Sequence, residues 1–176
     1  MKQKKKNQGT FLTNLDIKVS KWGIRFAGRS FPASVGKSGI TNSKNEGDGA
    51  TPAGVHKLVG VLYRPDRVVK PCDWAVQIKR NDIWSDDIRD PDYNMLNCLP
   101  HRYSHERFFR ADPIYDIIVL TDWNWPDPIK GQGSAIFIHT WRKPRHPTEG
   151  CVGLSNRNLL WIVSRVKPSS RLIVNI

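Results

Sequence analysis

The fold is decided by two neighbouring stretches, Gly133-Ser134-Ala135-Ile136-Phe137-Ile138-His139 and Thr148-Glu149-Gly150-Cys151-Val152-Gly153-Leu154-Ser155. The first contains a short apolar run bounded by turn residues, which is typical of a buried strand, and it ends on a histidine. A basic loop rich in turn residues follows over residues 141–147. We therefore expect a strand over residues 135–139 and, after the loop, a cysteine-containing turn that opens a helix.

That helix is the clearest in the sequence. Ser155 is the expected N-cap, Pro168 is expected to stop the helix, and one face carries Leu159, Ile162, Val163 and Val166. Elsewhere the apolar residues favour strands over residues 15–19, 22–26, 55–63, 74–78, 114–120 and 172–176. Residues 36–51 are expected to be a long loop, and residues 81–113 to be irregular with a short helix at 104–110. The sequence thus predicts a mainly β fold with one clear α-helix and irregular loops.

The composition describes a basic chain with an ordinary apolar content. Its 176 residues are enough for one domain and thin for two, and 39% of them are hydrophobic. The 28 Lys and Arg residues exceed the 16 Asp and Glu residues, and the resulting net charge of +12 predicts an anionic partner. Four lysines lie within residues 1–10, which we expect to be a disordered basic tail before a domain over residues 11–176.

Several classes of protein are disfavoured. We find no apolar run of the length of a signal peptide or membrane span, which predicts a cytoplasmic chain. The three cysteines are an odd number without CxxC spacing, so neither a disulfide framework nor a zinc knuckle is expected. Gly36-Lys37-Ser38 resembles the end of a phosphate-binding loop, but Phe31 stands where that loop needs glycine. The aromatic residues are scattered, so we expect weak binding to nucleic acid and no specific nucleic-acid partner.

A zinc peptidase is an alternative. His101 and His105 are four residues apart and could share a zinc ion with Asp112 or His139. However, no glutamate lies between these two histidines, as it does in the helical zinc-protease motifs. The simpler interpretation, which we favour, is a loop whose histidines form hydrogen bonds to its own backbone.

Cys151 and His139 are the candidates for nucleophilic chemistry. A free thiol is only a few per cent ionised at neutral pH, so a nucleophilic cysteine needs a base. A histidine at the end of a strand is held rigidly enough to serve as that base. Glycines at 150 and 153 leave room for a substrate backbone beside Cys151.

Taken together, these residues resemble the catalytic domain of the L,D-transpeptidase (YkuD) family, whose signature is a histidine, a variable loop and then Ser/Thr-His-Gly-Cys. His139, Thr148, Gly150 and Cys151 match that signature, and Thr51-Pro52-Ala53-Gly54-Val55 is similar to the family's Thr-Pro-x-Gly element. The resemblance extends from about residue 15 to residue 176. It implies a β-sandwich or barrel-like fold.

Two features depart from the family pattern. Glu149 occupies the position of the histidine that usually precedes Gly-Cys. The loop between His139 and Cys151 is also shorter than in typical secreted members. Both features indicate a divergent branch of the family.

The resemblance implies an enzyme that acts on the peptide stems of peptidoglycan or on muropeptides, without a cofactor or metal. Cys151 would form a thioester and release D-Ala, and His139 would transfer the protons. The carbonyl of Thr140 would orient the histidine ring, and the oxyanion would be bound by amides in the segment Cys151, Val152 and Gly153.

The resemblance also implies a site for anionic stem peptides. Arg110, Arg142 and Arg145 are the candidate contacts for substrate carboxylates. His105 and Tyr115 are expected to line the cleft, although packing also explains Tyr115. We expect hydrolysis of a tetrapeptide to a tripeptide, as in an L,D-carboxypeptidase of muropeptide recycling. The alternative is transpeptidation that forms 3–3 cross-links or exchanges D-amino acids.

Overall fold

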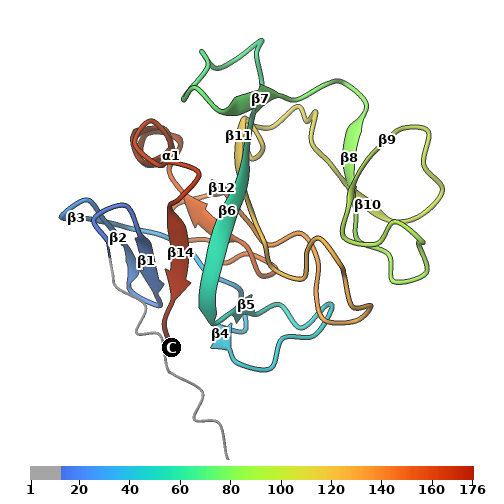
Figure 1. Ribbon diagram of the computed structural model, residues 1–176, viewed down its shortest axis with the longest axis horizontal. Coiled ribbons are helices and arrows are strands. Elements are labelled where there is room, and N and C mark those ends of the chain that lie inside the picture. The colour runs from blue at the N-terminus through green and yellow to red at the C-terminus, as the bar shows by residue number, and fades with distance from the viewer. Residues whose placement is uncertain (1–12) are drawn as a thin grey trace, which may run out of the picture.

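The computed structural model describes residues 13–176, which form a mainly β structure with a single α-helix (Figure 1). The elements are β1 (Ile17–Ser20), β2 (Gly23–Phe26), β3 (Arg29–Phe31), β4 (Ile40–Thr41), β5 (Thr51–Pro52), β6 (Gly54–Tyr63), β7 (Ala75–Gln77), β8 (Asp82–Ser85), β9 (Leu96–Cys98), β10 (His105–Arg107), β11 (Ile117–Thr121), β12 (Phe137–Thr140), β13 (Val152–Leu154), α1 (Asn156–Val163) and β14 (Arg171–Val174). The predicted fold class is confirmed. Within residues 13–176, no helix is long and apolar enough to cross a membrane.

The largest sheet curls until its two ends meet. Its strands follow the order β13-β12-β11-β6-β14-β1-β2-β3, and β7 pairs with β6 outside this path. Ser34 lies just beyond β3 and forms an antiparallel bridge with Gly153 in β13. The Ser34 amide donates to the Gly153 carbonyl at 2.8 Å, and the Gly153 amide donates back at 2.9 Å. These two bonds connect the edges of the sheet, which is therefore barrel-like.

The long strand β6 joins the two halves of this sheet. Residues 54–57 pair with β14, and residues 58–63 pair with β11 along the opposite edge. In Figure 1 the strand runs through the middle of the molecule, with α1 on one side and β8–β10 on the other. The strand β6 thus connects β14 and β1–β3 to β11–β13. In this second group, β12 contains His139, and β13 begins directly after Cys151.

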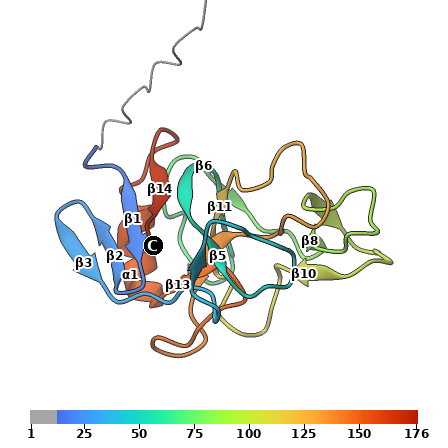
Figure 2. The ribbon, with the colours of Figure 1, turned by 90° about the horizontal axis from the view of Figure 1, so that it is seen from below.

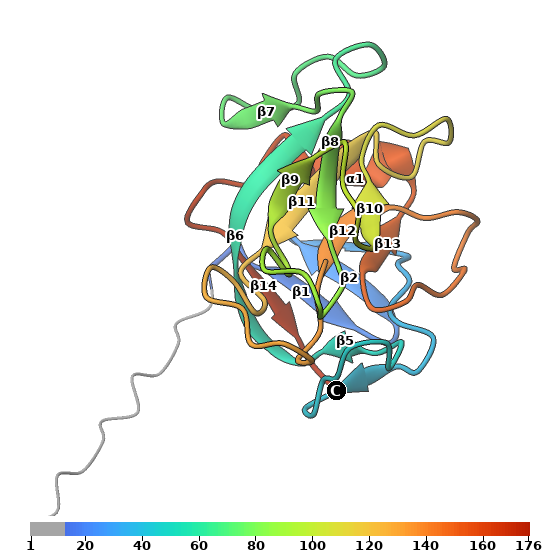
Figure 3. The ribbon, with the colours of Figure 1, turned by 90° about the vertical axis from the view of Figure 1, so that its right-hand side faces the viewer.

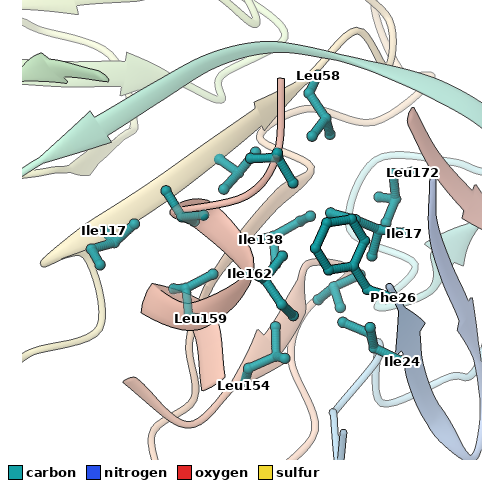
Figure 4. Close-up of a cluster of buried hydrophobic side chains, with 14 of the residues drawn as sticks. Ile17, Ile24, Phe26, Leu58, Ile117, Ile138, Leu154, Leu159, Ile162 and Leu172 are labelled. Carbon is teal, nitrogen blue, oxygen red and sulfur yellow. The ribbon is translucent and has the colours of Figure 1, made fainter. Parts of the chain in front are cut away.

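The main core lies inside the curled sheet, with α1 packed against it (Figure 4). Ser155 is the N-cap as predicted, because its hydroxyl accepts a hydrogen bond from the amide of Asn158 at 3.3 Å. The helix ends at Val163, before the predicted stop at Pro168. Its buried side chains are Leu159, Ile162 and Val163, which lie on one face as the spacing predicts.

A second sheet, in the order β10-β8-β9, projects on the side of the barrel away from α1 (Figures 2 and 3). The predicted helix at residues 104–110 is therefore wrong, since His105–Arg107 form β10 and pair with β8. Residues 81–113 also contain more regular structure than predicted. These strands are only three or four residues long, so each shows little of the alternation that identifies a strand.

Other boundaries differ in detail. The loop predicted at residues 36–51 is present, interrupted only by β4 and the start of β5. Trp22 is 76% exposed because it lies in the turn between β1 and β2, and Ile176 is exposed because β14 ends at Val174. The strands expected at 114–120 and 135–139 begin at Ile117 and Phe137. The predicted basic tail lies outside the described residues.

Two adjacent leucines of α1 provide a test of this packing. Leu159 is completely buried, whereas Leu160 is 39% exposed. We expect Leu159→Ala to lower the free energy of unfolding by about 2–5 kcal/mol, because it leaves a cavity in the core. Leu160→Ala changes the same helix and should cost about 0.5 kcal/mol or less. Urea unfolding of both variants measures the difference, and equal losses would contradict the assigned helix face.

Candidate active site

His139 and Cys151 lie on the same face of two adjacent parallel strands. In the pairing of β12 with β13, Ile138 is opposite Val152 and His139 is opposite Gly153. Because side chains alternate along a strand, Ile138 and Val152 point into the main core, and His139 points to the other face. Cys151 directly precedes β13 and shares that face, where Gly153 adds no side chain beside the histidine. The register thus places the thiol diagonally across from the imidazole.

The Cys151 thiol is held by two backbone groups. It donates to the carbonyl of Ala135 at 3.0 Å and accepts from the amide of Phe137 at 3.4 Å. Burial raises the pKa of Cys151 to about 12, and the negative charge of Glu106 acts in the same direction. At neutral pH the resting group is therefore a thiol, and attack requires a base.

The His139 ring is oriented as the sequence predicts. Its Nδ1 lies 2.8 Å from the carbonyl oxygen of Thr140. Since a carbonyl can only accept, Nδ1 carries the proton and Nε2 is left as the basic atom. The ring packs edge-on against Tyr115, with centroids 5.3 Å apart. Burial, together with the charge of Arg110, lowers the pKa of His139 to about 4, so the imidazole is neutral at physiological pH.

The turn that presents Cys151 is fixed by two threonines. The Thr148 hydroxyl donates to the carbonyl of Cys151 at 2.6 Å and accepts from the amide of Gly150 at 3.2 Å. Thr51, fully buried at the start of β5, donates to the carbonyl of Gly150 at 2.8 Å and accepts from the amide of Gly36. Gly150 has a φ of +147°, and a Cβ there would lie 3.0 Å from the carbonyl oxygen of Ala50. Only glycine fits this position without strain.

The predicted set of oxyanion amides is corrected by the closure of the barrel. The amide of Gly153 donates to Ser34 and is not free to bind an oxyanion. Successive amides of a strand point to opposite sides, so the amide of Val152 faces β12. Among residues 13–176, the amide of Cys151 itself donates to no acceptor. It is the remaining candidate of the three.

A cavity of about 280 Å³ opens in front of the thiol and imidazole. Of the residues predicted from the sequence, it is lined by Cys151, His139, Thr148, Arg110, Arg142 and Tyr115. Arg110 forms a bidentate ion pair with Asp112, at 2.9 and 2.6 Å. Glu149, at the position of the family's histidine, is 78% exposed and pairs with Lys37 at 2.7 Å. It therefore belongs to the rim of the cavity.

Two predicted substrate contacts lie elsewhere. Arg145 has a φ of +58° and lines a separate hollow with residues of β1–β3. His105 is absent from the cavity lining, and its Nδ1 lies 2.7 Å from the carbonyl oxygen of Tyr103. The Nε2 of His101 lies 2.8 Å from a carboxylate oxygen of Asp90. Among residues 13–176, no group of three or more His, Cys, Asp or Glu side chains is placed so that it could hold a metal ion.

The cavity also contains residues that sequence reasoning missed. Glu106, Ile114, His146 and Pro147 line it together with the predicted residues. His146 and Pro147 follow from their place in the loop before Thr148. Glu106 gave no comparable signal, because its segment was expected to be helical and its strand is placed by pairing with β8.

Comparison with known proteins identifies a family. The model of the YkuD family, the L,D-transpeptidase catalytic domain, matches residues 25–174. Similar solved structures include an L,D-transpeptidase from Mycobacterium smegmatis, with 15% identity, a TM-score of 0.42, and coverage of 87% of this chain and 52% of that one. Another is an LD transpeptidase in complex with imipenem, with 16% identity, a TM-score of 0.45, and coverage of 92% and 59%.

Searches of curated protein sequences give no significant match. The chain spans between half and two thirds of the length of the two solved structures. The family match nevertheless covers most of the chain and includes both His139 and Cys151. The chain therefore belongs to the YkuD family of L,D-transpeptidase catalytic domains.

Proposed function

We propose that this chain cleaves the L,D bond before the terminal D-Ala of peptidoglycan tetrapeptides, with Cys151 as the nucleophile and tripeptide as the product. The observation that supports this most strongly is the shared face of β12 and β13, where a base with a free Nε2 and a thiol line one cavity. Family membership indicates an enzyme that acts on peptidoglycan. The cleavage specificity and the role of each residue are our proposal.

The reaction begins from two neutral groups. As the sulfur of Cys151 attacks the carbonyl carbon of the third residue, Nε2 of His139 takes the thiol proton. The amide of Cys151 is positioned to donate to the developing oxyanion. An imidazolium at this buried position is costly, so it readily returns its proton to the amine of D-Ala as the C–N bond breaks. The remaining acyl group is a thioester on Cys151.

The second half of the reaction consumes this thioester. Neutral His139 takes a proton from water as the water oxygen attacks the thioester carbonyl. It returns that proton to the sulfur of Cys151 as the C–S bond breaks, which releases the tripeptide acid and the free thiol. The cavity of about 280 Å³ in front of the thiol and imidazole gives water access to the thioester. Arg142 is exposed at the cavity and is the freer of the two arginines to contact a substrate carboxylate, because Arg110 already pairs with Asp112.

The products of a single assay test the proposed reaction. We expect the purified protein to convert a disaccharide-tetrapeptide to the disaccharide-tripeptide and D-Ala, as identified by mass spectrometry. With free D-amino acids added, tripeptide should still exceed the exchanged tetrapeptide. An excess of the exchange product would establish the transpeptidase alternative instead.

The three cysteines provide matched controls for this assay. Cys151→Ala should abolish turnover, whereas Cys72→Ala and Cys98→Ala should retain it, since neither Cys72 nor Cys98 lines the cavity. Circular dichroism checks that each variant is folded. Retention of activity in folded Cys151→Ala would overturn the assignment of the nucleophile.

The neutral pair also predicts the pH dependence. The burial-lowered pKa of His139 means that the base is lost only as the pH falls through about 4, so activity should be retained from neutral pH down to about pH 5. The titration is followed by NMR of the His139 ring, whose signals are assigned by their loss in His139→Gln. A midpoint at or above 6.5 would contradict a buried neutral base.

A further inference from the structure

The cavity contains a carboxylate that the proposed reaction does not use. Glu106 is the central residue of β10, where it pairs with Trp84 of β8. It is partly buried and lines the same cavity as Cys151 and His139. Its negative charge contributes to the raised pKa of Cys151, so the carboxylate lies within electrostatic reach of the thiol.

Most of the hydrogen-bonding capacity of this carboxylate is free. An ionised carboxylate offers about four acceptor positions. Within the described part of the chain, Glu106 accepts a single hydrogen bond, from the Tyr115 hydroxyl at 3.2 Å, and has no ion pair. Arg110 lines the same cavity, but both of its donors to a carboxylate are directed at Asp112. The charge of Arg110 still lowers the pKa of Glu106, but no hydrogen bond joins these two side chains.

The electrostatics of the cavity favour a cation beside Glu106. Burial and the negative charge of Asp86 raise the pKa of Glu106, and the Tyr115 hydrogen bond and the charge of Arg110 offset only part of this rise. Glu106 in turn raises the pKa values of Tyr115 and Cys151. A positively charged ligand would stabilise the ionised carboxylate and offset this repulsion.

We propose that Glu106 binds a primary ammonium group of the substrate and thereby selects substrates with a free amine near the reacting carbonyl. The inference rests on the proposed function, because it concerns the same cavity and the same thioester chemistry. The ammonium comes either from the side chain of the diamino acid at the third position or from an amine acceptor, which must give one proton to neutral His139 before its nitrogen attacks the thioester. In both cases Glu106 determines specificity, and Cys151 and His139 perform the bond-breaking steps.

The first source of the ammonium, the third-position side chain of the acyl donor, is tested with two tetrapeptides that differ in one functional group. One carries a free side-chain amine at the third residue, and the other carries a hydroxyl in place of that amine. We expect the wild-type protein to prefer the amine about tenfold or more in kcat/KM, as a charged hydrogen bond provides. Glu106→Gln should remove this preference by lowering kcat/KM for the amine substrate alone.

The acceptor is tested in the same variants by exchange with a free D-amino acid. If the ammonium belongs to the acceptor, Glu106→Gln should lower the ratio of exchange to hydrolysis about tenfold, without changing the preference between the two donors. Asp127→Asn is the control, because it neutralises an exposed carboxylate that does not line the cavity and should leave both the donor preference and the exchange ratio unchanged. Tyr115→Phe removes the hydrogen bond but keeps the carboxylate, and should keep the discrimination.

The outcomes separate this inference from the proposed function. If the wild-type protein converts neither donor, the proposed function fails. If it converts both donors, and Glu106→Gln changes their kcat/KM by equal factors with no effect on the exchange ratio, Glu106 has only a structural role and the inference is overturned. Thermal unfolding of Glu106→Gln shows whether an equal loss results from instability.

Discussion

The active-site geometry depends on the pair of hydrogen bonds between Ser34 and Gly153. They connect β13, at one end of the sheet, to the segment after β3 at the other end, and they close the barrel around the main core. The same bonds fix β13, and therefore the turn that carries Cys151. Thr51 strengthens this junction, because its hydroxyl links the amide of Gly36 to the carbonyl of Gly150. The hydrogen bonds that close the sheet therefore also position the nucleophile.

The two faces of β12 have different roles, because one contributes to the main core and the other carries the catalytic histidine proposed above. Ile138 points into the main core, and Phe137 points to a second, largely aromatic cluster that includes Trp84, Phe108 and Tyr115. His139 follows on the same side as Phe137, so the base stands at the edge of that aromatic cluster. Packing against this cluster buries the imidazole and partly buries the thiol, and this burial accounts for the direction of both pKa shifts. The three-stranded sheet that covers this face also supplies Glu106.

Sequence reasoning was most successful where residue type and local spacing determine the structure. The N-cap of α1 and its buried face follow from short-range patterns. The association of His139 with Cys151 is implied by the family resemblance, and the register of β12 and β13 places the two side chains on one face. Sequence reasoning failed where long-range pairing decides the outcome. The strand containing Glu106 is too short to be recognised by alternation, and the use of the Gly153 amide by Ser34 depends on closure of the barrel. The left-handed backbone at Arg145 similarly places that side chain outside the cavity.

The central claim is that Cys151 carries the acyl group between two proton transfers by His139. It is tested most directly by acid-quenching the protein during turnover of a disaccharide-tetrapeptide, digesting it, and locating the adduct by mass spectrometry. The account predicts a thioester with the mass of the substrate less D-Ala on the peptide that contains Cys151. An acyl group on Cys72, Cys98 or any other residue, with Cys151 unmodified, would contradict it.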